Sequence, residues 1–326
     1  MFAAVARLRS SDPAELVTAA TDGDRAALAR LLTIVEHGGD DAAAIDRLTF
    51  GASGRARTIG LTGSPGAGKS TLTNALIAQA RAAGHRVGVL AIDPSSPFTG
   101  GAILGDRVRM GDHALDDQVF IRSMATRGHL GGLAVATPQA ARVLDVVGFD
   151  VVLIETVGVG QVEVEVAGEA DTTVVVVNPG WGDAVQANKA GLMEIADLFV
   201  INKADRPGGA DTRRDLEQML GLSAPGSDGW RAPILYTVAT TGQGVPELWA
   251  DLERHQRHLS GSGALAERRA ARLRTELDRV VAARLAERVG RLAAGDRYEQ
   301  LGAEVVARRL DPWSAADRLL TEAIDG

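Results

Sequence analysis

Nine consecutive residues early in the chain have the types and spacing needed to hold a phosphate group. Residues 63–70 match the pattern G-x-x-x-x-G-K-[ST], and Thr71 follows. Glycines let successive backbone N–H groups turn toward one phosphate, and a helix amino terminus adds partial positive charge. We expect the Lys69 ammonium to reach the β- and γ-phosphates and the Ser70 hydroxyl to ligate Mg²⁺. The predicted nucleotide-binding residues are Gly63, Ser64, Pro65, Gly66, Ala67, Gly68, Lys69, Ser70 and Thr71.

A second motif indicates which base this site reads. Asn202-Lys203-Ala204-Asp205 follows an apolar run at 198–202. The Asp205 carboxylate can accept hydrogen bonds from guanine N1–H and the 2-amino group, and adenine presents neither donor there. Lys203 can pack its stem along the base. Val238, Ala239 and Thr240, at the end of the last apolar run, are expected to close the pocket through backbone N–H groups. The sequence therefore favours GTP over ATP.

Three acidic residues are candidates for metal binding and catalysis. Glu155 ends the apolar run 151–155, Asp93 follows the run 86–92, and Asp106 lies in the glycine-rich stretch after it. Ligands of open α/β sheets bind outside the carboxyl ends of the strands. We therefore expect all three carboxylates, with Ser70, to hold Mg²⁺ and, with Lys69, to serve catalysis. Val159 stands where Ras-type proteins have a water-orienting Gln, which predicts slow hydrolysis until a partner completes the site.

The lysine content singles out one more candidate. Only three of the 35 basic residues are lysines, namely Lys69, Lys189 and Lys203. A compact ammonium is not interchangeable with a planar guanidinium, so each lysine marks a position where the difference matters. Lys189 is spaced three residues from Gln186, and Gln186 three from Asp183, so all three share one face of a helix. On that face they could reach a nucleotide or a partner together, and the alternative is a solvated helix face; Lys189 is a candidate catalytic residue.

The elements that must position these residues alternate between short apolar runs and helical patterns. Runs that are apolar on both faces are typical of buried parallel strands covered by helices. The sequence predicts a doubly wound α/β domain at 50–259, after an N-terminal helical segment at 1–49 and before a C-terminal helical arm at 260–326. The predicted strands are 58–62, 86–92, 119–123, 151–155, 172–178, 198–202 and 233–238, and the predicted helices between them are 69–83, 136–148, 184–196, 211–220 and 245–258.

The arm has no sheet to cover its apolar stripe, which includes Leu273, Leu277, Val281 and Leu285. This favours dimerisation or partner binding, and the alternative is a solvated helix folded back on its own domain.

The composition of the chain limits its function and location. A net charge of −7 argues against nucleic-acid binding, and the sequence has no apolar run long enough to span a membrane. The absence of cysteine excludes disulfides and cysteine-ligated metals, and we expect a cytoplasmic protein.

Taken together, the motif strings resemble the MeaB/ArgK family of P-loop GTPases, which belong to the SIMIBI class. The strings are GSPGAGKST, DPSSPFTGGAILGDRVRM, RSMATRGHLGGL, IETVGVGQVE, NPGWGDAVQANKAGLMEIAD and NKAD, and the similarity covers essentially the whole chain. The resemblance implies a chaperone of B12-dependent methylmalonyl-CoA mutase that gates adenosylcobalamin delivery and protects the mutase. It also implies a homodimer held by the C-terminal arm, and GTP hydrolysis stimulated by the mutase.

The resemblance also implies residue roles. Asp93 and Asp106 belong to the first switch, Glu155 to the second, and Asp183, Gln186 and Lys189 to a third that senses the partner. One departure is Val238-Ala239-Thr240, where the family usually has Ser-Ala-Lys or Ser-Ala-Arg. This departure affects only side chains of a loop whose expected base contacts are through the backbone.

Three other functions are compatible with parts of the pattern. A nickel-insertion GTPase shares the architecture but generally needs cysteines or a His-rich tract, and this chain has no Cys and six scattered His. A kinase tied to basic amino-acid transport would need an acceptor site that the sequence does not show. A binding module whose nucleotide only sets its shape remains open because of Val159, and hydrolysis measured with and without partner distinguishes it.

Overall fold

The computed structural model describes residues 12–93, 113, 115–125, 130–156, 169–180, 194–222, 229–293 and 295–324. The chain divides into two compact units, Met1–Arg272 and Leu273–Gly326. Within the described residues, no helix is both long and apolar enough to cross a bilayer.

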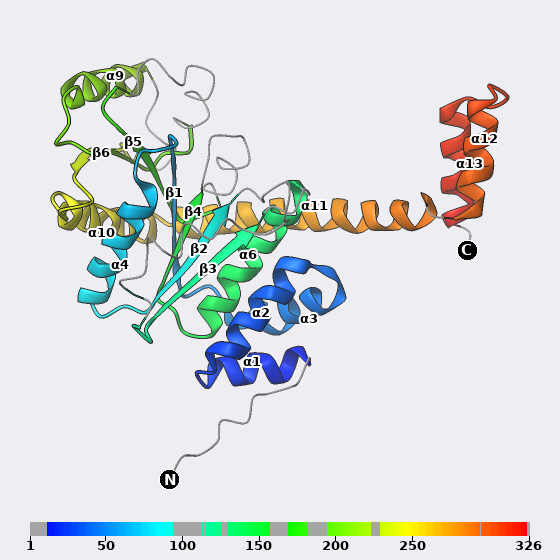
Figure 1. Ribbon diagram of the computed structural model, residues 1–326, viewed down its shortest axis with the longest axis horizontal. Coiled ribbons are helices and arrows are strands. Elements are labelled where there is room, and N and C mark those ends of the chain that lie inside the picture. The colour runs from blue at the N-terminus through cyan, green and yellow to red at the C-terminus, as the bar shows by residue number, and fades with distance from the viewer. Residues whose placement is uncertain are drawn as a thin grey trace, which may run out of the picture. The chain divides into compact units, whose positions relative to one another are not determined.

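A seven-stranded sheet forms the centre of the first unit, and its strand pairs are all parallel (Figure 1). The strand order is β3-β2-β4-β1-β5-β6-β7. The chain starts at the central β1, runs to one edge through β2 and β3, returns to place β4 between β2 and β1, and then continues to the other edge. All seven strands were predicted from apolar runs, and the predicted doubly wound parallel sheet is confirmed. The strands are β1 (Arg57–Gly63), β2 (Val87–Asp93), β3 (Val119–Ala125), β4 (Val151–Thr156), β5 (Thr172–Val177), β6 (Leu198–Asn202) and β7 (Ile234–Thr237).

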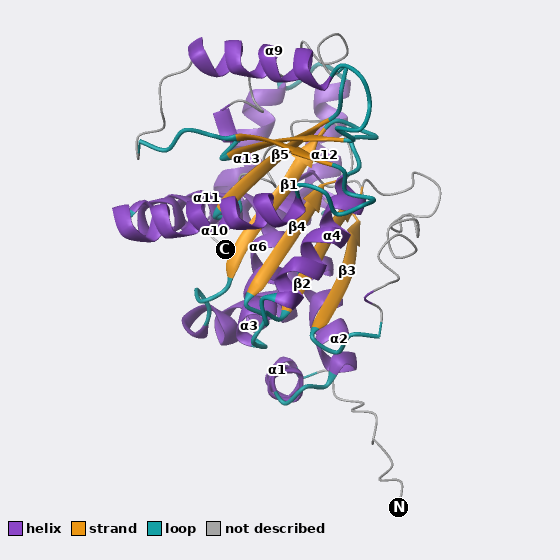
Figure 2. Cartoon of the chain, turned by 90° about the vertical axis from the view of Figure 1, so that its left-hand side faces the viewer, coloured by secondary structure: helices purple, strands orange, loops and turns teal. Residues whose placement is uncertain are grey.

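Helices cover both faces of this sheet, which explains why its strands are apolar on both sides (Figure 2). Val174 and Val176 of β5 belong to the core beneath α4 (Lys69–Ala82) and α10 (Val245–Ser262). Val175 and Val177 point to the other face, where they pack with Leu216 of α9 (Gly209–Leu222). On that same face α6 (Leu130–Val146) covers β2 and β4.

The N-terminal segment, predicted to be helical, has three helices in its described part: α1 (Pro13–Thr21), α2 (Arg25–His37) and α3 (Gly39–Thr49), with a short 3₁₀ turn at Phe50–Ala52. Asp12 caps α1 by accepting a hydrogen bond from the Ala14 N–H, as the Asp-Pro pair predicts. Leu28, Leu31, Leu32 and Val35 bury one side of α2 against α6. These helices therefore extend the core of the first unit.

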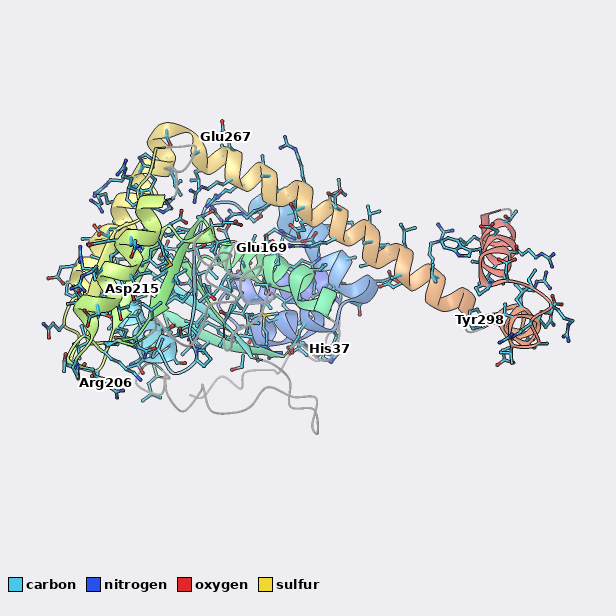
Figure 3. The ribbon with its side chains drawn as sticks, turned by 90° about the horizontal axis from the view of Figure 1, so that it is seen from above. His37, Glu169, Arg206, Asp215, Glu267 and Tyr298 are labelled. Atoms are coloured by element: carbon cyan, nitrogen blue, oxygen red, sulfur yellow. The ribbon has the colours of Figure 1, made fainter. Side chains whose placement is uncertain are left out.

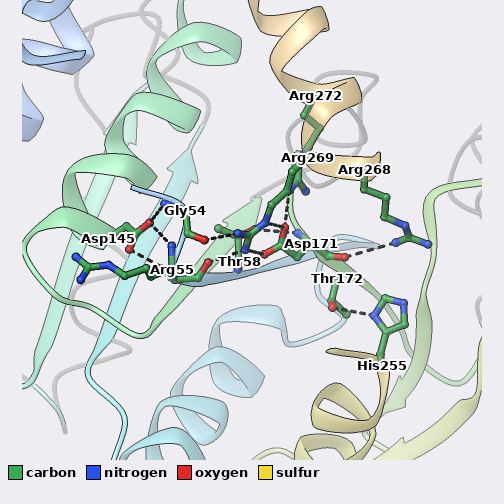
Figure 4. A network of polar contacts seen from close by, with 11 residues as sticks. Gly54, Arg55, Thr58, Asp145, Asp171, Thr172, His255, Arg268, Arg269 and Arg272 are labelled. Carbon is green, nitrogen blue, oxygen red and sulfur yellow. Dashed lines mark hydrogen bonds and ion pairs between the residues drawn. The ribbon is translucent and has the colours of Figure 1, made fainter. Parts of the chain in front are cut away.

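A polar network lies at the amino-terminal ends of the central strands, opposite the ends that carry the motifs (Figure 4). Its centre is Asp171, whose side chain is 1% exposed. The carboxylate accepts hydrogen bonds from the Thr58 N–H at 3.2 Å, from Arg269 at 3.0 and 2.6 Å, and from Arg272. Burial raises the pKa of Asp171, but hydrogen bonds and charges from Arg269 and Arg272 outweigh burial, so the pKa lies below its ordinary value.

The same network holds the residues that lead into β1. Arg269 also donates to the Gly54 and Ala56 carbonyls, while Asp145 of α6 accepts hydrogen bonds from the N–H groups of Gly54, Arg55 and Ala56. Both Arg269 and Arg272 lie in α11 (Ala264–Ala293), which follows α10 after the single residue Gly263. The first turns of the predicted arm are thereby fixed to the sheet.

The second unit consists of the rest of α11, then α12 (Asp296–Val306) and α13 (Pro312–Ile324). The long amphipathic helix predicted for this region is confirmed. Leu301 is buried, but a row of large apolar side chains on α11 is about half exposed: Leu273, Leu277, Val281, Leu285 and Val289. Their spacing of four residues places them in one ridge along the helix.

Replacing Asp171 tests the network. Asp171→Asn leaves two arginines without their anion, and we expect the free energy of unfolding to fall by about 3 kcal/mol. Denaturant titration measures this change. Asp211→Asn removes a carboxylate that is 74% exposed and serves as the control. Equal stabilities of the two variants would contradict the assigned role.

The depressed pKa of Asp171 also gives a direction for the pH dependence of stability. The stabilisation is fully present above the unfolded-state pKa of about 3.9 and is lost as the pH falls through the lower folded-state value. Asp171→Asn should therefore lose less stability than the wild type between pH 5 and pH 2 (about the range in which a carboxylate titrates).

Candidate nucleotide-binding site

The phosphate loop follows β1 at the carboxyl end of the sheet, and its tight turn depends on two glycines. Gly63 has φ +130°, and a Cβ there would lie 1.9 Å from the Val176 carbonyl oxygen of β5. Gly68 has φ +92°, and a Cβ there would lie 2.5 Å from the Asn202 side-chain nitrogen. The loop lies so close to β5 and to Asn202 that no side chain fits at either position, and only glycine is accommodated there.

Lys69 and Ser70 open helix α4, as the motif predicts. The Lys69 ammonium donates to the carbonyls of Gly63 at 2.8 Å and Ser64 at 3.1 Å, so its charge is held within the loop. Both Lys69 and Ser70 are 7% exposed. An ammonium at this position can neutralise phosphate charge without a large rearrangement.

Glu155 of β4 contacts Ser70 in the first turn of α4. The Ser70 hydroxyl donates to Glu155 Oε1 at 2.6 Å, and Glu155 is fully buried. Strand register places Glu155 beside Leu61 of β1 and Ala91 of β2. Ala91 is two residues before Asp93, the last residue of β2, so Asp93 lies at the same edge of the sheet. The Asp93 side chain and all of Asp106 lie outside the described residues.

These oxygen ligands suit Mg²⁺, a hard cation that protein sites usually bind through one or two carboxylates, a hydroxyl and substrate phosphates. Ser70 and Glu155 would hold the ion here, and it would supply charge to the β- and γ-phosphates. Among the described side chains, no three histidines or carboxylates gather closely enough to hold a metal unaided. A hydroxyl and a carboxylate of this kind suit an ion that phosphate oxygens also help to hold.

Asn202 connects the phosphate loop with the base-reading loop. Its side-chain nitrogen donates to the Ala67 carbonyl at 2.8 Å. Its oxygen accepts from the Thr237 hydroxyl at 3.0 Å and from the Ala239 N–H at 3.1 Å. Asn202 is 2% exposed, so all three hydrogen bonds are shielded from water. One side chain therefore fixes three segments relative to one another: the phosphate loop, the end of β6 and the end of β7.

Lys203 reinforces this connection from outside. Its ammonium donates to the Gly66 carbonyl at 2.7 Å, and its backbone adopts φ +60°, a left-handed conformation rare for a side-chain-bearing residue. Asp205, two residues later, is exposed, as a carboxylate that awaits a base must be. The ammonium groups of two of the three lysines, Lys69 and Lys203, therefore bond to carbonyls of the phosphate loop.

The remaining predicted residues are distributed as follows. Val238 and Ala239 are buried and Thr240 is exposed, in a turn closed by the Val238 N–H and the Gln243 carbonyl. Asp183, Gln186 and Lys189 lie outside the described residues. Sequence reasoning missed Thr237, whose hydroxyl holds Asn202. Its position directly before the base-loop residues was the available signal.

Removing the Asn202 side chain tests this connection. Asn202→Ala leaves a buried carbonyl, hydroxyl and N–H without their partner, and we expect GTP binding to weaken by about 2 kcal/mol, roughly 30-fold in Kd. Isothermal titration calorimetry measures the affinity, with exposed Gln218→Ala of α9 as the control. A Kd for Asn202→Ala within twofold of the wild type would refute the role.

Comparison with known proteins shows the family of this chain. The family model described as methylmalonyl Co-A mutase-associated GTPase MeaB matches residues 28–294. A Pyrococcus abyssi protein is 50% identical, over 96% of this chain and 97% of its own length. The Escherichia coli GTPase ArgK is 38% identical, over 78% of this chain and 79% of its own.

A solved structure shows the same architecture. The crystal structure of an LAO/AO transport system kinase superposes with a TM-score of 0.71 at 28% identity, covering 98% of this chain and 99% of the other. The fold is that of P-loop GTPases of the SIMIBI class. With its phosphate loop, its guanine motif and the family match over most of its length, the chain belongs to the MeaB family of mutase-associated GTPases.

Proposed function

We propose that this protein binds and hydrolyses GTP with Mg²⁺ and acts as a chaperone of B12-dependent methylmalonyl-CoA mutase. In this role it gates adenosylcobalamin loading and protects the mutase from inactivation. The observation that carries the proposal is the Asn202 connection, because it joins a phosphate loop to a guanine-reading motif in one rigid site. Membership of a mutase-associated family supports the choice of partner.

Each residue has a distinct task in binding. Lys69, already held by the phosphate loop, offsets charge on the β- and γ-phosphates. Ser70 and Glu155 hold Mg²⁺, together with Asp93 and Asp106 of the first switch. Asp205 accepts hydrogen bonds from guanine N1–H and the 2-amino group. GTP therefore contacts the phosphate loop through its phosphates and the Asp205 loop through its base.

Hydrolysis is expected to be slow without a partner. Val159 cannot orient the attacking water, since it has no hydrogen-bonding side chain. The cluster of Asp183, Gln186 and Lys189 supplies the missing charge when the mutase binds. In this scheme Lys189 acts as an arginine finger does elsewhere, an interaction worth about 10³–10⁵ in rate.

Mutase stimulation of the Lys189 variant tests this scheme. Lys189→Ala should reduce the ratio of mutase-stimulated to basal kcat to about one, because the transition-state charge that Lys189 supplies is lost. Steady-state phosphate release with saturating mutase measures the ratio. Exposed Arg257→Ala is the control and keeps full stimulation. Full stimulation of Lys189→Ala would make Lys189 an ordinary surface residue.

We also propose that the second unit makes the protein a homodimer. The exposed ridge on α11 comprises five large apolar residues, which water would not favour on an isolated helix. A second copy presents the same ridge, so a two-fold contact can cover both. Because Arg268, Arg269 and Arg272 already bond to Asp197 and Asp171 within the first unit, the portion of α11 available for this contact begins after Arg272.

Truncation after Arg272 tests the dimer while keeping the Asp171 network. We expect this variant to be a monomer that still binds GTP, because it retains the first compact unit. Light scattering measures the mass. In the full chain, Leu277→Glu with Leu285→Glu should give the same monomer, whereas Ala283→Glu, on the opposite side of α11, should remain dimeric. A dimer formed by the truncated chain would exclude the ridge as the interface.

A further inference from the structure

The loop that carries Asp205 runs from Lys203 to Gly208, between β6 and α9. Two hydrogen bonds hold its first residues. The Lys203 ammonium donates to the Gly66 carbonyl, and the Ala204 N–H donates to the Thr237 carbonyl at 3.1 Å. Asp205 itself is exposed and projects from the middle of the loop. Figure 3 marks Arg206 in this loop and Asp215 in the helix that follows. The accuracy with which Asp205 meets a base therefore depends also on how the loop ends.

Thr212 of α9 holds that end. Its hydroxyl donates to the Gly208 carbonyl at 3.1 Å and accepts a hydrogen bond from the Gly180 N–H at 3.2 Å. Thr212 is 2% exposed. A hydroxyl has one donor and can accept as well, so this single group serves two segments at once. Thr212 thereby joins the end of the Asp205 loop to the residues just after β5.

The surroundings show that the two segments lie close together. A Cβ built on Gly208 would be 3.7 Å from both the Gly180 nitrogen and the Pro179 Cβ, an ordinary van der Waals contact. On the other side, the Tyr236 hydroxyl donates to the Gly209 carbonyl at 3.3 Å. Tyr236 is 37% exposed, whereas Thr212 is buried, so Thr212 makes the shielded contact. Hydrogen bonds therefore hold the Asp205 loop at both ends, and the buried Thr212 side chain makes those at its far end.

We propose that Thr212 is a positioning residue for guanine specificity, an inference that rests on the proposed reading of the base by Asp205. The carboxylate distinguishes guanine from hypoxanthine through the 2-amino group, which hypoxanthine lacks. This distinction requires a fixed carboxylate, because hydrogen bonds weaken steeply as their geometry deviates. Thr212 keeps the loop in the orientation that the 2-amino group requires.

The experiment compares GTP with ITP. In the Thr212→Val variant, which keeps the side-chain shape but loses the hydroxyl, the ratio of the ITP Kd to the GTP Kd should fall about fivefold, a coupling typical of neighbours in one hydrogen-bond network. Thr212→Ser keeps the hydroxyl and should keep the wild-type ratio. Thr49→Val is the matched control, because Thr49 is also a buried helical threonine bonded to a carbonyl four residues earlier.

Variants at Asp205 separate this inference from the proposed function. Asp205→Ala should lower the ratio at least as much, and adding Thr212→Val should lower it no further. If Asp205→Ala keeps the wild-type ratio, the proposed reading of the base is wrong. If Asp205→Ala lowers the ratio but Thr212→Val does not, only the role of Thr212 is overturned. An equal fall in Thr49→Val would assign the effect to general destabilisation and also overturn it.

Discussion

The site depends on the buried amide of Asn202. Its three hydrogen bonds join the phosphate loop at Ala67 to the base loop at Thr237 and Ala239. Leaving any of these buried partners unsatisfied costs about 1–3 kcal/mol, so Asn202 holds the phosphate loop and the base loop in one fixed arrangement. This arrangement also requires a glycine at position 68, because the Asn202 amide occupies the space that a Cβ would need. A nucleotide therefore meets phosphate and base groups already positioned relative to each other.

The opposite end of the sheet is organised by another buried polar group. Asp171, at the start of β5, is bonded to β1 through Thr58 and to α11 through two arginines. Strands β1 and β5 pair with each other and run from this network to the nucleotide site. The root of the arm and the phosphate loop are thus attached to opposite ends of the same two strands.

Much of this architecture was predictable because local patterns determine it. Apolar runs of strand length gave all seven strands, since a parallel sheet covered on both faces must be apolar on both faces. The phosphate loop was predictable because its spacing directly reflects backbone geometry around a phosphate. The arm differed in detail. The predicted arm begins at residue 260, but residues 260–262 complete α10 and only Gly263 separates it from α11.

By itself, the sequence determined the types of chemistry: a phosphate loop, a guanine motif, acidic residues at strand ends and three retained lysines. Which of these groups meet was decided by tertiary structure. The hydrogen bond from Ser70 to Glu155 joins the first turn of α4, which follows β1, to β4, the strand that pairs with β1, although the two residues are far apart in the chain. Thr212 and Thr237 carry no motif and were not predicted. Their importance arises only because folding brings their hydroxyls within reach of loop atoms, and a hydrogen bond depends on distance and direction rather than on sequence.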